Sequence, residues 1–381
     1  MWKITILIWA ILLSGDVYSQ SEMSEGSEFS NHPSLVKSLR INDKLEFCGE
    51  TTPLDVQEVR ERLEKELLLT LADRPQVILW IKRSNRYLPL IEKKLTENGL
   101  PDDLKYVAIV ESALRPHVGS PKGAIGFWQF MEGTGQIYGL KIDAEMDERR
   151  NIFKSTHAAI QYFKVLYEDL GSWTLAAAAY NMGEEGLKAE ILAQKNDNYY
   201  QLYLPLETQR YIFRIIAAKL ILSQPEKYGF RLNPDDLYPP LQFDRVVFEC
   251  NQKTPIHVIA GAAGTYFKVI KDLNPEIRGH FLMEGHHALL VPKGSAADFH
   301  TRYELALADW VANRNEQIYF VQEGDNLSSI AARYNVPLPA LLIWNNLNPN
   351  RHIHPGDRLV LYPPDNIDEK TKLESDDTPH D

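Results

Sequence analysis

Helical hydrophobic spacing from residue 55 to residue 223 is the feature that most restricts how this chain can fold. In its first part, residues 55–71, apolar Val59, Leu63 and Leu67 stand at every fourth position among charged side chains. This spacing places them on one face of a helix. Further stretches of the same kind follow, separated by Gly and Pro, which interrupt helices. We therefore predict one mainly helical domain over residues 55–223.

The pattern changes after that domain. Residues 224–244 are rich in Pro and are predicted to be a connector. Residues 245–295 contain two strand-like runs around a short helical one, and residues 316–363 follow a β-α-α-β plan around a Gly-Asp turn. The tripeptides Leu273-Asn274-Pro275 and Leu347-Asn348-Pro349 occupy equivalent positions in the two modules, which indicates an internal duplication. The predicted fold class is mainly α, with two small α+β modules after the helical domain.

The two ends of the chain are predicted to lie outside these domains. Residues 1–19 have an early Lys, a short apolar run and small residues before a cut after Ser19, which is typical of a secretory signal peptide. The alternative is a retained anchor, although the run is short for a membrane span. We expect an exported protein with no integral membrane segment after cleavage. Residues 20–54 are predicted to be a lead-in segment and residues 364–381 a disordered tail.

Composition excludes two classes of function. The formal net charge is −11 and the pI is about 5.5. Nucleic-acid binders and proteins that dock on anionic lipid by charge need a basic face, so neither class is expected. Hydrophobic residues make up 44% of the chain, which is enough for a buried core. The sequence leaves the oligomeric state undetermined.

Two cysteines, Cys48 and Cys250, leave two alternatives open. In an exported protein an even pair can form a disulfide, and two buried thiols are the other possibility. Two Cys cannot build a structural zinc site without His partners at suitable spacing. We interpret the paired histidines as loop residues and expect no metal and no cofactor. These histidines are His286, His287, His352 and His354.

Glu111 is the candidate catalytic residue. It follows a predicted helix start at Pro101 and lies on one helix face with Leu104, Val107 and Ala108. A carboxyl among such neighbours is desolvated, which raises its pKa and lets it donate a proton near neutral pH. The alternative is a buried Glu in an internal hydrogen-bond or ion-pair network, and this helix alone does not decide between them.

Two neighbouring motifs add candidate binding residues. The loop 116–126 is rich in Gly and Pro, and residues 127–131 then place aromatics beside Gln129, a mixture that suits a sugar. The Ala-rich helical stretch 173–181 ends in Tyr180 and Asn181, with a Gly beyond as a stop. Core packing and helix capping are the alternative explanation for each motif taken singly.

Taken together and in order, the motifs resemble those of soluble lytic transglycosylase domains with a lysozyme-like fold, and most of all the membrane-bound lytic murein transglycosylase D group. The small C-terminal repeat resembles a LysM module. The resemblance covers most of residues 48–363. The motifs are ESAL at 111–114, GAIGFWQFMEGTG at 123–135, LAAAAYNMG at 175–183, LETQRYIFRIIAAK at 206–219 and, for LysM, FVQEGDNLSSIA from residue 320.

The resemblance implies roles for particular residues. Glu111 matches the catalytic Glu of the family. Substrate-binding positions are matched by Ser120, Gln129, Met131, Tyr180, Asn181 and Tyr211. In the LysM module, glycan-binding positions are matched by Gly324, Asp325, Asn326, Leu327, Pro349 and Ile353. Residues 245–295 lack the Gly-Asp turn, so we do not expect that module to bind sugar. Phe127 stands where the family commonly has Leu, and the lipid-attachment Cys of the group's namesake is absent.

The resemblance also implies a reaction. The partner would be peptidoglycan, a polymer of N-acetylglucosamine (GlcNAc) and N-acetylmuramic acid (MurNAc). The enzyme would cleave it without water and leave 1,6-anhydro-MurNAc ends. This would serve cell-wall remodelling in the periplasm, at the cell wall or outer membrane. Ordinary glycosidases use two carboxylates, and the sequence shows no second acidic residue in a context like that of Glu111. Two alternatives stay open: a hydrolytic muramidase and a non-catalytic peptidoglycan-binding protein.

Overall fold

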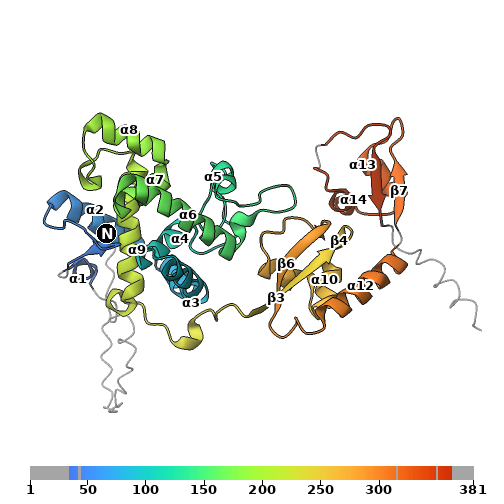
Figure 1. Ribbon diagram of the computed structural model, residues 1–381, viewed down its shortest axis with the longest axis horizontal. Coiled ribbons are helices and arrows are strands. Elements are labelled where there is room, and N and C mark those ends of the chain that lie inside the picture. Colours follow the sequence, from blue (N-terminus) through green and yellow to red (C-terminus); the bar gives the residue numbers. More distant parts are fainter. Residues whose placement is uncertain (1–33, 42–43, 315, 349–350, 363–381) are drawn as a thin grey trace, which may run out of the picture.

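The computed structural model describes residues 34–41, 44–314, 316–348 and 351–362. A large helical part is followed by two smaller parts, each containing short helices and paired strands (Figure 1). The predicted fold class, mainly α with small α+β modules, is confirmed. The predicted signal peptide and tail lie outside the described residues. No helix in the described part is both long and apolar enough to cross a membrane.

The helical part has one main core, around which its helices pack. Helix α9 lies against α2, α4 and α7, and α6 lies against α7. The side chains of Ala176 to Ala179 on α7 are fully buried, and their small size lets the neighbouring helices approach closely. The helices are α2 (Gln57–Ala72), α3 (Arg74–Glu97), α4 (Lys105–Ser112), α5 (Glu132–Ile137), α6 (Ile152–Leu170), α7 (Trp173–Met182), α8 (Glu184–Gln194) and α9 (Leu206–Ser223), with 3₁₀ turns at Asp102–Leu104, Glu148–Arg150 and Tyr199–Gln201.

The segment before α2 is more ordered than a lead-in. It forms α1 (Leu35–Ser38) and a hairpin of β1 (Glu46–Phe47) and β2 (Glu50–Thr51). The Phe47 side chain is fully buried in the main core. The Glu50 carboxylate accepts hydrogen bonds from Ser172 Oγ (2.9 Å) and Thr174 N (3.0 Å) at the start of α7. Residues 44–54 therefore belong to the helical part, because their apolar and capping contacts are made there.

The Pro-rich connector runs along the helical part. Tyr228 and Phe230 are buried in a second cluster with residues of α2 and α9. The Tyr238 carbonyl accepts a hydrogen bond of 2.9 Å from Asn85 Nδ2 on α3. Two short 3₁₀ turns, Pro225–Tyr228 and Pro234–Asp236, shape this stretch.

The second part has its own core. Strand β3 (Phe243–Cys250) pairs antiparallel with β6 (Gly285–Pro292), with Val246 opposite Leu289. Helix α12 was not predicted. It packs on α10 and buries Phe299 and Tyr303 in this core. The other elements are β4 (Thr254–Pro255), α10 (Ile256–Ala262), α11 (Phe267–Leu273), β5 (Phe281–Leu282) and α12 (Phe299–Asn313).

The third part follows the predicted β-α-α-β plan. Strand β7 (Gln317–Phe320) pairs antiparallel with β8 (Arg358–Leu361). Helices α13 (Leu327–Arg333) and α14 (Leu338–Asn345) lie between them in sequence. The three separate cores support the proposed division of the chain into a helical domain, a middle module and a C-terminal module.

The disulfide alternative for the two cysteines is wrong in this structure, where both thiols are free. Cys48 lies at the edge of the main core, and its backbone N donates to Asp103 Oδ2 at 2.7 Å. Cys250 is buried in the core of the middle module, and its thiol donates to the Gln252 carbonyl at 3.1 Å. Burial raises the pKa of the Cys48 thiol. Each cysteine is held by its own core, which keeps the pair apart.

Candidate active site

Glu111 lies in the last turn of α4 and lines a cavity. The helix behind it is apolar, and Val107 and Ala108 are fully buried. It ends abruptly, because Ala113 (φ 52°) and Leu114 (φ 57°) both adopt the left-handed conformation. Residues other than Gly rarely adopt this conformation, so the turn fixes the helix end at a cost of about 1 kcal/mol per residue. Glu111 is thereby held on a rigid element rather than on a loop.

Opposing effects set the pKa of Glu111 at about 7. Burial is the largest and raises the pKa, because a charged carboxylate loses hydration there. A hydrogen bond from Tyr211 Oη to Glu111 Oε1 lowers it, as does the positive charge of Arg214, while Glu207 raises it. Burial also raises the pKa of Tyr211 well above its usual value, so this phenol is a donor at neutral pH. Glu111 can therefore both give and accept a proton near pH 7.

The cavity beside Glu111 has a volume of about 560 Å³. Five of the six predicted substrate-binding residues line it together with Glu111: Ser120, Gln129, Met131, Tyr180 and Asn181. The sixth, Tyr211, is buried and contacts the carboxyl of Glu111. The structure thus gathers residues from α4, the loop 118–131, α7 and α9 around one carboxyl.

The loop 118–131 forms one wall of the cavity. Gln129 has φ 49°, and its amide nitrogen donates to the carbonyls of Val118 (3.0 Å) and Gly126 (2.8 Å). Ser120 Oγ accepts from Ala124 N at 3.0 Å. Both side chains therefore shape the loop on which they lie. Met131, at 45% exposure, is one of the apolar side chains of this loop that line the cavity, with Pro121, Ala124 and Phe130.

Two aromatics of this motif, Phe127 and Trp128, are core residues that do not line the cavity, as the alternative explanation held, whereas Phe130 lines it. Phe127 and Trp128 are buried, and Trp128 Nε1 donates to Thr156 Oγ1 at 3.0 Å. They cannot stack on a ligand without unpacking the core. Hydrophobic pattern alone did not show which way these rings face.

The end of α7 forms the opposite wall. Tyr180 Oη donates to the Trp128 carbonyl at 2.6 Å, and its ring stacks on Phe163 with centroids 4.7 Å apart. Asn181 Oδ1 accepts from Thr208 Oγ1 on α9 at 2.9 Å. Helix α7 ends at Gly183, whose φ of 92° is readily adopted only by glycine. These bonds tie the end of α7 to the loop 118–131 and to α9.

Glu207 is a cavity residue that the sequence analysis missed. It lies exposed in the first turn of α9 and lines the same cavity as Glu111. A signal for it existed in the motif LETQRY, where Glu207 precedes Tyr211 by four residues and so shares its helix face. The expectation of a site with one carboxylate is therefore incomplete.

The predicted LysM residues form a tight turn before α13. Gly324 has φ 87°, and the Asp325 carboxylate accepts from Gln322 N (2.8 Å) and Arg333 Nη2 (3.1 Å). Asn326 caps α13 by accepting from Ser329 N at 2.8 Å. Leu327 is a core residue, and Ile353 packs against that core. Pro349 lies outside the described residues. Glycan binding at these positions stays a prediction.

Two family models match the chain. Residues 89–203, which contain all the cavity residues except Glu207, match the Transglycosylase SLT domain, and residues 319–361 match the LysM domain. The chain contains a transglycosylase SLT domain and a LysM domain. The predicted resemblance and the predicted enzyme class, a lytic transglycosylase, are thereby confirmed.

Two relatives found by sequence bear the name of a lytic transglycosylase. The membrane-bound lytic murein transglycosylase D of Escherichia coli strain K12 is 29% identical over 333 residues, which is 83% of this chain and 72% of the relative. The protein of the same name from Escherichia coli O6:H1 matches equally. Among solved structures, the 70 kDa soluble lytic transglycosylase SLT70 from Escherichia coli matches 45% of this chain and 33% of its own, at 18% identity and a TM-score of 0.33.

Proposed function

We propose that this protein cleaves the bond between MurNAc and GlcNAc in peptidoglycan and leaves 1,6-anhydro-MurNAc ends. The observation that carries the proposal is a carboxyl with a pKa of about 7, held by Tyr211 beside a 560 Å³ cavity within the SLT domain. A group that is half protonated near neutral pH suits a reaction in which one residue acts first as acid and then as base.

The reaction follows from that property. Protonated Glu111 gives its proton to the glycosidic oxygen as the bond to MurNAc C1 breaks, and GlcNAc leaves with a 4-hydroxyl. The acetamido oxygen of the substrate stabilises the positive charge at C1. Glu111, now a carboxylate, takes the proton of the MurNAc C6 hydroxyl. At the same time the oxygen of that hydroxyl forms a bond to C1. The residue returns to its acid form, and no water is consumed.

The surrounding residues have binding and positioning roles in this proposal. Tyr211 orients the Glu111 carboxyl through its hydrogen bond. Met131 offers an apolar contact, and Ser120, Gln129, Tyr180 and Asn181 line the sugar-binding cavity. The LysM module would bind GlcNAc-rich strands between the turn 324–327 and the loop 348–356. A second attachment point raises the concentration of the enzyme on its polymer.

The same proposal places the protein outside the cytoplasm. Peptidoglycan is an extracytoplasmic polymer, and the signal-like residues 1–19 fit export to the periplasm. There the protein would act in cell-wall remodelling, at the wall or the outer membrane.

Glu207 favours a second candidate function, a hydrolytic muramidase. A carboxylate in the same cavity could activate a water for attack at C1, as the second carboxylate of ordinary glycosidases does. Mass spectrometry of muropeptides released from purified sacculi separates the two. Anhydro ends support the transglycosylase, and reducing ends would establish the muramidase. Loss of both products in Glu111→Gln, with binding to sacculi retained, excludes a non-catalytic binding protein.

A further inference from the structure

The segment 141–151 joins the helical domain to the middle module. Met146 pairs with Ile277 in an antiparallel bridge, and its side chain packs against the core of that module. Asp147 N donates to the Glu276 carbonyl at 2.8 Å, and Arg278 N donates to the Glu145 carbonyl at 2.9 Å. The middle module is thus attached by backbone pairing and an apolar contact.

Side chains strengthen this attachment. Asn151 Nδ2 donates to Glu276 Oε1 at 2.8 Å, and the Glu276 side chain is only 6% exposed. Nearby, the rings of Phe153 on α6 and Phe243 on β3 meet edge to face with centroids 5.6 Å apart. Among the described residues, the other carboxyl oxygen of Glu276 is buried without a hydrogen-bond partner, and burial raises the pKa of this carboxyl. The polar part of the contact therefore rests on the Asn151 bond and on the backbone pairing.

The same segment also supports the wall of the active-site cavity. Arg149 and Asp147 form a buried ion pair, with Nε to Oδ1 and Nη2 to Oδ2 both at 2.9 Å. Arg149 Nη1 donates to the carbonyls of Gly123 (3.1 Å) and Phe130 (3.2 Å), at two points of the loop that carries Gln129. A planar guanidinium with several fixed donors suits this bridging role.

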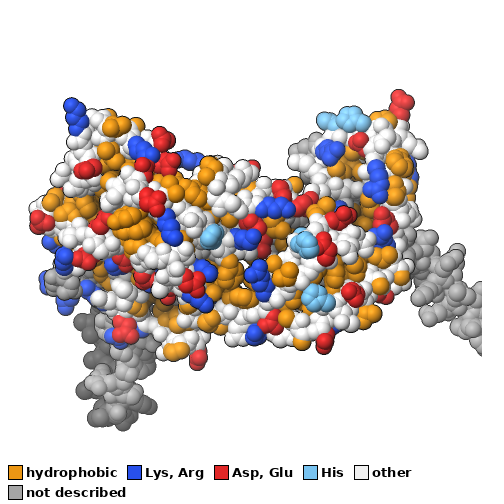
Figure 2. All heavy atoms as spheres, in the orientation of Figure 1, with side chains coloured by type: hydrophobic (Ala, Val, Ile, Leu, Met, Phe, Trp, Pro, Cys, Tyr) orange, Lys and Arg blue, Asp and Glu red, His pale blue; other side chains and the backbone are white. Residues whose placement is uncertain are grey.

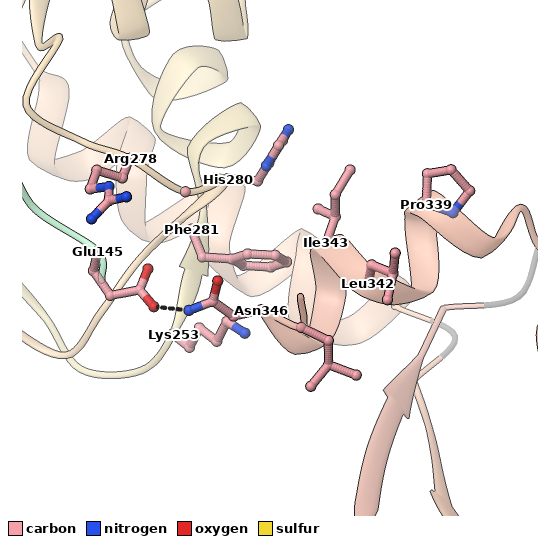
Figure 3. Close-up of a pocket in the computed structure, with 11 residues that line it drawn as sticks. Glu145, Lys253, Arg278, His280, Phe281, Pro339, Leu342, Ile343 and Asn346 are labelled. Carbon is pink, nitrogen blue, oxygen red and sulfur yellow. Dashed lines mark hydrogen bonds between the residues drawn. The ribbon is translucent and has the colours of Figure 1, made fainter. Parts of the chain in front are cut away.

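The C-terminal module reaches the segment as well. Where the three parts meet, a cavity of about 350 Å³ is lined by Glu145, Arg278, Phe281 and Asn346 among others. Figure 3 shows the Asn346 amide and the Glu145 carboxylate pointing toward each other, and their hydrogen bond is 2.6 Å long. Figure 2 shows the middle of the molecule filled continuously between its two ends on the face in view.

We propose that the middle module acts as a positioning element of the active site: it holds segment 141–151, whose Asp147–Arg149 pair fixes the loop 118–131. The contacts form an unbroken series from Glu276 through Asp147 and Arg149 to the carbonyls of Gly123 and Phe130. Arg149 contacts the loop and Asp147 contacts Arg149, while neither lines the cavity, so both are positioning residues. The expected effect of the middle module on catalysis rests on the proposed function. Its expected effect on the order of the loop 118–131 does not.

Two variants of the full chain test it. Met146→Asp places an unpaired carboxylate in the apolar contact and should release the middle module, because burying such a charge is unfavourable. Met146 is outside the main core, so the helical domain keeps its fold. Arg149→Lys keeps the charge but loses the planar bridge to the loop. Leu192→Asp, at a 77% exposed site on α8, is the matched control for an added charge.

Three measurements read the outcome: small-angle scattering, amide exchange over residues 118–131, and initial rates on soluble glycan strands. We expect Met146→Asp to enlarge the scattering envelope, and both variants to speed exchange in the loop about tenfold. Because a misplacement of about 1 Å can cost roughly 100-fold in rate, kcat should fall at least tenfold while KM stays within about twofold. A general loss of stability would instead speed exchange in α4 and α9 as well.

An unchanged envelope in Met146→Asp would overturn the proposal. So would an enlarged envelope with loop exchange and kcat equal to those of Leu192→Asp, or unchanged loop exchange in Arg149→Lys. If the wild type released no glycan product, the proposed function would fail while scattering and exchange still decided the positioning role.

Discussion

The Tyr211 hydroxyl donates its hydrogen bond to Oε1 of Glu111, a residue 100 positions earlier in the chain. Helices α9 and α4 bring the two together in the main core, where Tyr211 is only 1% exposed. A buried phenol with a raised pKa keeps its proton near neutral pH and can donate it to a carboxylate. The bond therefore favours the carboxylate form of Glu111 and opposes the effect of burial on its pKa.

The rate should depend on the protonation of Glu111. Its pKa is about 7, and the first step needs the acid form. We expect kcat/KM on soluble glycan strands to fall about tenfold for each pH unit well above 7. Initial rates between pH 5 and pH 9 measure this. A rate that stayed constant to pH 9 would rule out Glu111 as the acid with this pKa.

Removing the Tyr211 hydroxyl should shift that pH dependence. In Tyr211→Phe the stabilisation of the carboxylate is lost, so the pKa of Glu111 rises and the decline of kcat/KM begins at higher pH. The maximal rate should fall about tenfold, because the carboxyl is less well oriented. Tyr228→Phe is the matched control, since the buried Tyr228 hydroxyl has no hydrogen-bond partner among the described residues. A decline shifted to lower pH would contradict the assigned role.

Glu111 should reduce stability at high pH. Its folded-state pKa of about 7 lies above the usual value of 4.5, so the folded protein binds more protons than the unfolded chain between these values. The stability is full below pH 4.5 and decreases as pH rises through 7. Glu111→Gln removes this effect and should be more stable than wild type at pH 8, by about 1–3 kcal/mol. Urea unfolding at pH 4.5 and pH 8 measures the difference, which should be small at the lower pH.

Glu50 should stabilise the helix that carries Tyr180. Its carboxylate accepts hydrogen bonds from the first backbone amides of α7, where a negative charge also interacts well with the helix dipole. We expect Glu50→Gln to lower the free energy of unfolding by about 1–2 kcal/mol. Urea midpoints test this, with Glu61→Gln on the exposed side of α2 as control. Equal midpoints for the two variants would show that the cap contributes nothing.

Sequence periodicity predicted the helical domain and the C-terminal module because both rest on local patterns. The apolar face around Val107 predicted a buried helix with Glu111 on it, and α4 has that character. The raised pKa of Glu111 followed from the same face. Roles of individual site residues stay predictions until they are tested by substitution.

Features that depend on distant contacts were not predicted. Glu207 reaches the cavity only because α9 packs against α4. The hairpin at residues 46–51 lies in the predicted lead-in segment, yet its Phe47 enters a core built from residues far along the chain. Asp147 and Arg149 are charged and nevertheless buried, because they pair with each other. No local pattern encodes such partners.

The close contact between Gly126 and segment 141–151 limits which residues position 126 can hold. A Cβ atom at this position would lie 1.9 Å from the Arg149 carbonyl oxygen, and the glycine φ of 85° is itself unfavourable for other residues. In a library that covers all substitutions at position 126, glycine should therefore be the one residue that remains after selection for activity. Tolerance at Lys122 on the same loop, whose side chain is exposed, should be broad. The loop would thus combine a position that must be glycine with exposed positions that can vary. Changes in substrate preference could arise at the exposed positions without loss of the fold.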